Sequence, residues 1–426
     1  MTSSKRILLA TFGSLGDLHP YLALALGLKA RGHQPIVATS GAYENTVTAL
    51  GLEFRAVRPD VPDPATTTAA MREVMDERRG TDVVLQQWVV PTLRDAAADL
   101  MTASADVDLI VSHLLTFAAP VVAEARRLPW VSSILQPGSA FSIYDPPVVA
   151  RTMLLSRIPF LGPWFWRHFR RAATGYVDRW FAPLHELRAD LGLPRLERSP
   201  VFDNPSPWLD LALFSPLFGP RQPDWPPQTV ITGFPFFDPP GSGDLPSDLA
   251  DFFGEGPPPL VFTLGSSAVH DPGHFYEASV SAARRLGERA LLLVGRGEGR
   301  PVGRLASNLF AIDYVSHAAV FPRAAAIVHQ GGIGTTAQAL RAGTPMLVVP
   351  FAHDQPDNAR RAVSLGVART LPRRRYAAER VTRDLDALLR DPRYTRRAAE
   401  IGVLIRAEDG VGRACDALEA VMDSRA

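Results

Sequence analysis

The expected fold is decided by residues 327–360, which read IVHQGGIGTTAQALRAGTPMLVVPFAHDQPDNAR. An apolar run typical of a buried strand leads into a glycine-rich turn, and two threonines then open a helix that ends at Gly343. This order places backbone N–H groups and two hydroxyls at a helix N-terminus, where the helix dipole favours an anion. We therefore expect a phosphate site, formed by Gly332, Gly334, Thr335 and Thr336.

A second polar loop, PFAHDQPDN, follows the apolar run at residues 346–349. A loop at the carboxyl end of a strand is where open α/β sheets bind their ligands. Asp354 and Gln355 can hydrogen-bond a polyhydroxyl group there. Together with a diphosphate on the first loop, this indicates a nucleotide-sugar. The first turn lacks the lysine of a Walker loop, so no flexible cation grips a terminal nucleotide phosphate.

Strands and helices alternate along both halves of the chain, which predicts parallel, doubly wound sheets. The first half opens with a strand-loop-helix unit whose loop reads GSLGDLHP. The expected fold class is α/β, with two Rossmann-like domains that face each other across a cleft. The expected strands are residues 6–12, 35–39, 52–57, 109–112, 130–135, 211–214, 229–232, 260–264, 290–294, 309–315, 325–328 and 346–349.

A proline-, glycine- and aspartate-rich segment, residues 235–259, predicts a linker between an N-terminal domain (1–234) and a C-terminal domain (260–409). At about residues 139–191 the N-terminal domain carries a helical insertion crowded with aromatic side chains. The tail, residues 410–426, has helical periodicity and is expected to pack on one of the domains, with a return to the N-terminal domain as one option.

Composition narrows the function classes. A chain of 426 residues with 46% apolar residues can build large cores, and 45 Lys and Arg against 44 Asp and Glu argue against a nucleic-acid partner. No apolar run reaches the roughly 18–20 residues of a membrane span. The lone Cys415 excludes a disulfide framework, and no clear cluster of metal-binding acids is present. A cytoplasmic enzyme without a metal ion fits best.

With these motifs in view, the chain resembles the UDP-glycosyltransferase superfamily of GT-B fold, in particular its bacterial branch of sterol, glycopeptide and rhamnolipid glycosyltransferases. HQGGIGTTAQALRAGTP with HDQPDNA is similar to the donor-binding signature, and GSLGDLHPYLALA is similar to the N-terminal catalytic loop. The resemblance implies an acceptor-binding N-terminal domain and a nucleotide-sugar-binding C-terminal domain. It implies an inverting, metal-independent transfer with no cofactor beyond the nucleotide-sugar co-substrate, UDP-glucose or a dTDP-sugar.

The resemblance also implies roles for single residues. Asp17 occupies the position of the acceptor-activating base, and His113 falls where plant members keep an aspartate that partners this base. The implied donor-binding residues are Ser14, Gly265, Ser266, Tyr314, Val315, His329, Gln330, Gly332, Gly334, Thr335, Thr336, Gln338, Asp354 and Gln355. Two positions depart from the pattern. Gln330, with His329 beside it, replaces the histidine that touches the diphosphate, and Gln338 replaces the acid that binds ribose.

Each role has a structural alternative. Asp17 could cap a helix that starts near Pro20, because aspartate is a favoured capping residue. His19 is a rival base at the cleft edge, and His113 could be an ordinary histidine at a strand end. Asp354 could cap the helix that follows it.

The aromatic insertion has three interpretations. Its side chains can line an apolar acceptor pocket, they can form the core of the insertion, or RIPFLGPWFWRHFRR can rest on an anionic membrane surface. The implied acceptor-binding residues are His19, Phe141, Tyr144, Phe160 and Trp164.

The leading hypothesis is a glycosyltransferase that moves glucose from UDP-glucose to a hydroxyl of a lipophilic small molecule, as a monomer or homodimer. The likeness of PDWPPQTVITGFPFFD to the rhamnolipid rhamnosyltransferase chain keeps dTDP-rhamnose and a hydroxy-acyl lipid open. A nicotinamide-dependent dehydrogenase is disfavoured because GSLGDL lacks G-x-G-x-x-G. A non-catalytic nucleotide-sugar binder is the third alternative.

Overall fold

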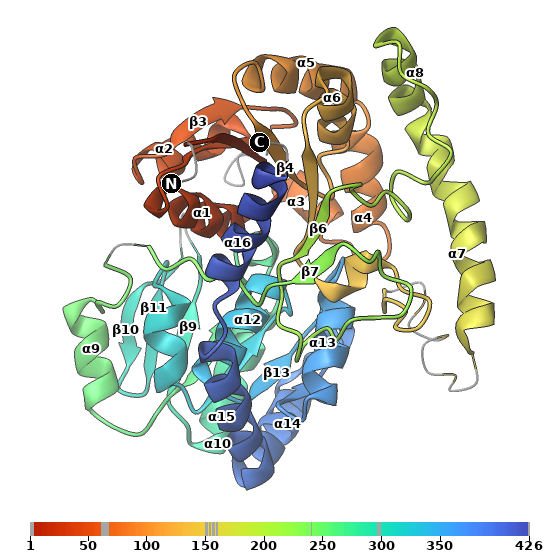
Figure 1. Cartoon of the computed structure of the whole chain (residues 1–426). Coiled ribbons are helices and arrows are strands. Elements are labelled where there is room, and N and C mark those ends of the chain that lie inside the picture. Colours follow the sequence, from red (N-terminus) through yellow and green to blue (C-terminus); the bar gives the residue numbers. More distant parts are fainter. Residues whose placement is uncertain are drawn as a thin grey trace.

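The computed structural model describes residues 4–60, 68–149, 152, 155, 158, 161–239, 241–295 and 300–424. It contains two seven-stranded sheets, one in each half of the chain, which lie one above the other in Figure 1. The first sheet has the order β3-β2-β1-β4-β5-β6-β7 and is parallel throughout. Its strands are β1 (Arg6–Ala10), β2 (Gln34–Thr39), β3 (Glu53–Ala56), β4 (Leu109–His113), β5 (Trp130–Ile134), β6 (Leu209–Ala212) and β7 (Thr229–Ile231).

The second sheet has the order β10-β11-β9-β8-β12-β13-β14, and only the β10–β11 pair in it is antiparallel. Its strands are β8 (Leu260–Thr263), β9 (Ala290–Leu293), β10 (Gly303–Ala306), β11 (Leu309–Ile312), β12 (Ala326–His329), β13 (Met346–Val348) and β14 (Ala368–Thr370). The predicted α/β class with two doubly wound sheets is therefore confirmed. The edge strands β10 and β14 were not predicted.

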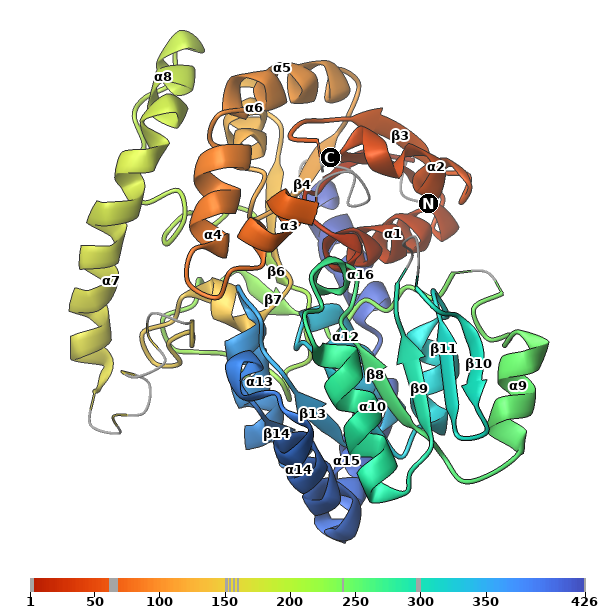
Figure 2. The same ribbon diagram turned by 180° about the vertical axis from the view of Figure 1, so that it is seen from behind.

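Helices cover both faces of each sheet (Figures 1 and 2). In the first half they are α1 (Leu15–Ala30), α2 (Glu44–Thr48), α3 (Thr68–Val74), α4 (Gly80–Val83), α5 (Leu93–Ala103), α6 (Ala118–Arg126), α7 (Pro163–Val177) and α8 (Ala182–Asp190). In the second half they are α9 (Ser247–Gly254), α10 (Phe275–Leu286), α11 (His317–Val320), α12 (Ile333–Ala342), α13 (Gln355–Ser364), α14 (Ala378–Arg390), α15 (Pro392–Arg406) and α16 (Gly410–Asp423).

Strand β1 shows how the layers arise, because successive side chains of a strand point to opposite faces. Ile7 and Leu9 pack in a core with apolar residues of α1 and α16, whereas Leu8 and Ala10 pack in a second core with residues of α5 and α6. The second sheet likewise has one core on each face. Because both faces are covered, the central strands read as continuous apolar runs, which made them predictable.

The last helix, α16, lies against α1 of the N-terminal half. A Cβ atom added at Gly27 would come within 3.1 Å of Cys415 Sγ, so the two helices approach closely there. Arg31 forms salt bridges of 2.6 Å with both Asp416 and Glu419 at this contact. The chain thus crosses to the second sheet and returns to the first.

The two halves also meet through an ionic network between the loop before Val148 and helix α13. Asp145 forms salt bridges with Arg360 (2.9 Å) and Arg361 (2.7 Å). Asp357 pairs with the same two arginines, at 2.9 and 2.7 Å, and accepts a hydrogen bond from Val148 N. Asp357 and Arg361 are buried, so this network fixes the loop against α13.

Within the described ranges, no helix combines the length and the apolar character that crossing a membrane would need.

Candidate functional site

Asp17 lies in the first turn of α1, where its two carboxylate oxygens have different surroundings. Oδ2 accepts hydrogen bonds from the backbone N–H (2.7 Å) and the hydroxyl (3.1 Å) of Ser14. Oδ1 lies 3.9 Å from Nε2 of His113. The Asp17 side chain is 29% exposed, so a ligand can reach it. Gly13 is required beside it, because its φ is +136° and a Cβ there would overlap the Asp17 carboxylate.

The start of α1 differs from the expectation. The helix begins at Leu15, not near Pro20, and Ser14 is its N-cap. Ser14 Oγ accepts from Gly16 N, while the Asp17 side chain accepts from the Ser14 N–H, which together form a capping box. Asp17 therefore does have a helix-capping role, at the third helical position, and this role uses only Oδ2.

His113 ends β4 and is buried, with 6% of its side chain exposed. Its Nδ1 accepts a hydrogen bond of 3.4 Å from Leu115 N, which puts the proton of the neutral ring on Nε2, the atom that faces Asp17. Burial lowers the pKa of His113, and the charge of Asp17 opposes this shift. The imidazole is thus a neutral N–H donor directed at Oδ1 of Asp17.

The glycine-rich turn between β12 and α12 lies opposite the first turn of α1. Gly332 is the N-cap of α12. Gly334 is exposed, and a Cβ added there would lie 3.8 Å from Gly16 Cα. The N-terminal ends of α1 and α12 therefore lie close together across the two halves. Thr336 Oγ1 donates to Gly332 O within this turn (3.0 Å).

Gln330 and His329 point in different directions. His329 is fully buried, with Nδ1 accepting from Gly331 N (3.0 Å) and Nε2 near Met346 Sδ (3.4 Å). Burial lowers the pKa of His329 to about 3. Gln330, 6% exposed, has its amide nitrogen against the backbone of Gly265 and Gly332. Its Oε1 finds no hydrogen-bond partner among the described residues. An unpartnered buried amide between two loops is a group that a ligand could satisfy.

The second polar loop is tied to the first. Asn358 Nδ2 donates both to Gly331 O (2.9 Å) and to Asp354 Oδ2 (2.6 Å). Asp354 is the N-cap of α13, but its side chain makes no capping hydrogen bond. Burial raises the pKa of Asp354 to about 7, a shift that the hydrogen bond from Asn358 reduces and the charge of Asp17 increases. Gln355 Oε1 accepts from Phe351 N and Ala352 N, which folds this side chain back onto its own loop.

The other predicted donor residues surround the same strand ends. Gly265 and Ser266 follow β8, and Gln338 lies on α12. Tyr314 and Val315 follow β11, with Tyr314 52% exposed and Val315 buried in the core. The structure thus gathers the ends of β1, β4, β8, β11, β12 and β13 on the sides of the two sheets that face each other.

The predicted acceptor residues are not brought together. Trp164, 71% exposed, lies on α7, which stands at the side of the molecule away from α1 in Figures 1 and 2. Tyr144 is 48% exposed, and the ring of Phe141 packs on Phe202 at 4.8 Å. Phe160 lies outside the described residues.

His19, the rival base, packs its ring on Phe237 at 5.1 Å. Burial lowers the pKa of His19 to about 4. The ring is therefore neutral at pH 7 and is engaged with an aromatic neighbour.

One residue of the polar loop received no role from its sequence. His353 precedes Asp354, has a left-handed backbone (φ +57°), and lies 3.1 Å through Nδ1 from Thr81 Oγ1 of the other half. The sequence signal that could have indicated a role for His353 was its position between Phe351 and Asp354, in a loop with a predicted ligand role.

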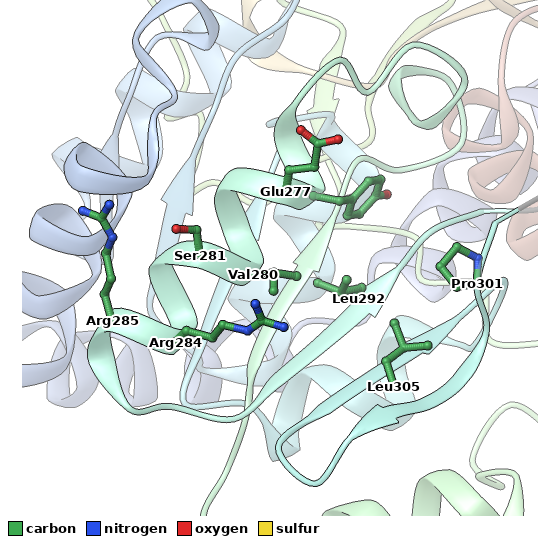
Figure 3. A pocket seen from close by; sticks show the side chains of 9 residues that line it. Glu277, Val280, Ser281, Arg284, Arg285, Leu292, Pro301 and Leu305 are labelled. Atoms are coloured by element: carbon green, nitrogen blue, oxygen red, sulfur yellow. The ribbon is translucent and has the colours of Figure 1, made fainter.

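A surface hollow of about 600 Å³ lies between α10 and β10 (Figure 3). Val280, Arg284 and Leu305 are among its lining residues. None of the predicted site residues lines it, so this hollow is separate from the candidate site.

Two family descriptions match the chain. Residues 7–144 match the glycosyltransferase family 28 N-terminal domain. Residues 281–409 match the C-terminal domain described as erythromycin biosynthesis protein CIII-like. The two matches cover the first turn of α1 and the glycine-rich turn of α12.

Among similar proteins, O-mycaminosyltylonolide 6-deoxyallosyltransferase of Streptomyces fradiae is 34% identical over 99% of this chain and 98% of its own length. Sterol 3-beta-glucosyltransferase of Cryptococcus neoformans is 30% identical over 97% of this chain, which spans 27% of that protein. The crystal structure of the glycosyltransferase VinC in complex with dTDP superposes with a TM-score of 0.66 at 22% identity, covering 98% of this chain and 100% of that one.

The full-length match to the Streptomyces enzyme, the two family matches and the shared two-sheet architecture agree with the arrangement of the strand ends described above. The chain therefore belongs to the UDP-glycosyltransferase superfamily of GT-B fold, and it is a glycosyltransferase.

Proposed function

We propose that the protein transfers a sugar from a nucleoside diphosphate to a hydroxyl of a lipophilic small molecule, with inversion and without a metal ion. One observation carries this proposal: the Asp17–His113 pair lies opposite the glycine-rich N-terminus of α12. A base and a diphosphate site on opposite sides of one space are what a single displacement at the anomeric carbon needs.

Asp17 Oδ1 is the atom that would take the acceptor proton. Its partner oxygen accepts hydrogen bonds from Ser14, whereas Oδ1 lies 3.9 Å from Nε2 of His113. A carboxylate is a weak base, but proton transfer coupled to attack requires chiefly correct placement and partial desolvation. Because its Nδ1 accepts from Leu115 N, the neutral His113 ring carries its proton on Nε2, so it would orient Asp17 and would not replace it as the base.

The leaving diphosphate would be held by the N-terminus of α12. Backbone N–H groups at a helix N-terminus stabilise the negative charge that develops on the leaving group. Thr335 and the amide of Gln330 border the same turn. The acceptor oxygen would bond to the anomeric carbon from the Asp17 side as the bond to the diphosphate breaks on the α12 side, through an oxocarbenium-like state. Attack from the opposite face inverts the anomeric configuration.

Asp354 and Gln355 are the proposed contacts of the sugar hydroxyls. Asn358 donates to one carboxylate oxygen of Asp354, and Asp354 lies close enough to Asp17 for the two charges to interact. Gln355 uses its Oε1 within the loop, which leaves its amide N–H groups to donate to a sugar hydroxyl.

We propose UDP-glucose as the first donor to test, with a dTDP-6-deoxyhexose such as dTDP-rhamnose as the alternative. The name of the sterol relative supports glucose. The 6-deoxyallosyl name of the Streptomyces relative and the dTDP in the VinC crystal support the alternative. The same names support a sterol or a macrolide as the hydroxylated acceptor.

The test is a thermal-shift measurement with UDP-glucose, dTDP-rhamnose and NADH, followed by product analysis with cholesterol, O-mycaminosyltylonolide and 3-hydroxydecanoic acid. A ligand that binds only the folded state raises the melting temperature by mass action. We expect one nucleotide-sugar to raise it and to support, in the presence of EDTA, formation of a product whose anomeric configuration is opposite to that of the donor. A shift with NADH alone, or retention of configuration, would contradict the proposal.

A further inference from the structure

The left-handed backbone of His353 is a feature that the proposed mechanism does not use. Its φ of +57° lies in a region that residues other than glycine rarely adopt. Such conformations persist only where the surroundings fix the residue, and they gather at ligand clamps and active sites. The contacts of the His353 ring therefore show what holds this loop in place.

Groups of the N-terminal half hold the ring. Nδ1 of His353 lies 3.1 Å from Oγ1 of Thr81, on α4, and the ring also bonds to the carbonyl of Val74, at the end of α3. Gly80 permits this arrangement. A Cβ added at Gly80 would overlap the Val74 carbonyl and would come within 3.3 Å of His353 Cε1.

The segment that holds the ring, residues 71–81, is itself anchored on the C-terminal half, and we call it the strap. Met75 is 2% exposed and packs in the core of the C-terminal half with Phe262 and Phe351. Arg72 Nε lies 3.3 Å from Asp271 Oδ1. The strap thus contacts the other half at Met75, at Arg72 and at Thr81.

His353, which the strap holds, directly precedes Asp354, the proposed sugar contact in the second polar loop. Asp354 is the N-cap of α13, and its carboxylate accepts a hydrogen bond from Asn358. Rotation of the His353 backbone out of its left-handed state would therefore redirect Asp354. The charge of Asp17 raises the pKa of both His353 and Asp354, against the effect of burial at His353 and along with it at Asp354, so Asp17 interacts electrostatically with both.

We propose that His353 is a positioning residue: the strap fixes its imidazole, and the imidazole fixes Asp354 in the geometry that contacts the donor sugar. This inference rests on the proposed function. It assigns to Thr81 and His353, which lie in different halves, a joint effect on the sugar part of the donor and none on the nucleotide part.

The test compares Thr81→Val with Thr81→Ser, and His353→Ala with His353→Asn. Serine keeps the hydroxyl, and asparagine keeps a hydrogen-bonding group and tolerates a left-handed backbone. Thr102→Val is the matched control, because Thr102 is an exposed residue of α5 whose hydroxyl donates to Ala98 O within the same helix. Each variant is assayed for kcat and for the KM of UDP-glucose or dTDP-rhamnose, and for the Kd of UDP or dTDP.

We expect Thr81→Val and His353→Ala to lower kcat/KM for the donor by about threefold to tenfold, the effect of one lost hydrogen bond. The Kd of UDP or dTDP should not change, Thr81→Ser and His353→Asn should recover most of the loss, and the double variant should be no worse than His353→Ala. A Thr81→Val enzyme equal to wild type, additive losses, or an equal loss of nucleotide affinity would overturn the inference.

A second measurement does not depend on turnover. Amide hydrogen exchange of the strap in the full-length His353→Ala chain should be faster than in wild type, because its contact with the loop is lost. Unchanged exchange in the strap would overturn the inference. If exchange in the strap is unchanged while the wild-type enzyme is active, only the proposed role of His353 is refuted. A wild type that transfers no sugar refutes the proposed function, whatever the exchange shows.

Discussion

Asp17 combines two tasks in one side chain, and the geometry separates them by oxygen atom. Oδ2 is held by Ser14 and closes the first turn of α1, whereas Oδ1 faces Nε2 of His113. Because the helix start fixes the carboxylate, the proposed base needs little reorganisation when an acceptor arrives. The capping interpretation and the catalytic one are therefore compatible.

Replacing Asp17 by asparagine separates these tasks. The asparagine oxygen can still accept from the Ser14 N–H, so the fold should persist, but an amide cannot take a proton. We expect kcat to fall by about 10²–10⁴-fold with a melting temperature close to that of wild type. Asp409→Asn is the control, since Asp409 also accepts a capping hydrogen bond, from Gly412 N at the start of α16, and has no proposed role in the reaction. Full turnover by the Asp17→Asn enzyme would assign the base to another residue.

At the residue scale, sequence predicts which strand ends carry polar groups but not where each side chain points. The spacing of HQGG places His329 and Gln330 beside the turn. Only the packed sheet decides that His329 turns inward toward Met346 while Gln330 lies against Gly265. The role of His353 depends on Thr81, which is 272 residues away, and no local pattern contains that contact.

The N-terminus of α12 is the element on which the proposed diphosphate site depends. Gly334 has no unusual φ, and a Cβ added there would meet nothing closer than Gly16 Cα at 3.8 Å. A glycine that the fold does not require, at an exposed helix start, indicates that a ligand approaches the backbone.

Gly334→Ala tests this point. Alanine in a helix is about 0.5–1 kcal/mol more stable than glycine, so the free energy of unfolding should stay equal or rise. The Kd of UDP or dTDP should nevertheless increase, because a methyl group would stand between the phosphate and the N–H groups. Gly175→Ala on α7, where a Cβ also meets nothing, should stabilise the protein without affecting the nucleotide. Equal nucleotide affinity in both variants would move the diphosphate away from α12.

Elements differ in how far sequence predicts them, and burial is the physical reason. Strands such as β8 and β12, buried on both faces, leave apolar runs that periodicity detects. The edge strands β10 and β14 are partly exposed and carry Arg304 and Arg369, so they resemble loops. Their pairing is decided by the neighbouring strands β11 and β13.

For the whole molecule, three histidines with lowered pKa values should make stability depend on pH. Burial lowers the pKa of His19 and of His317 to about 4, and that of His329 to about 3. Below the unfolded pKa of 6.5 the unfolded chain binds more protons than the folded one, so the free energy of unfolding should decrease as the pH falls from about 6.5 to 4. Asp354 and Asp210, with pKa values raised to about 7 and about 6, act in the opposite direction.

His317→Gln isolates the histidine contribution. The slope of the free energy of unfolding against pH, measured by urea unfolding between pH 6.5 and 4.5, should be smaller than that of wild type. The total change over this range should be smaller by about 1–3 kcal/mol, since one pKa unit corresponds to about 1.4 kcal/mol. His168→Gln on α7 is the matched control, because His168 is exposed, and it should leave the slope unchanged. The same slope in both variants would show that His317 titrates normally in the folded protein.

The arrangement of the two halves is the part that sequence predicts least. The doubly wound pattern predicts each sheet, but the contacts between them join distant residues. Asp145 and Arg361 are one example, and the pairing of Arg72 with Asp271 is another. Such pairs follow from the packed surfaces, and each member alone reads as an ordinary solvent-exposed charge.

The return of α16 onto α1 bears on how hybrid enzymes can be built from this chain. Exchanging the C-terminal half for that of a relative requires two junctions, one in the segment before β8 and one at residues 407–409 before α16. In a hybrid with a single junction, the helix that packs against Gly27 would come from the relative. In this protein Val411 and Cys415 of α16 fit against Gly27 because it has no side chain. Shuffling of donor preferences among such enzymes is therefore constrained by a helix that contains none of the predicted donor residues.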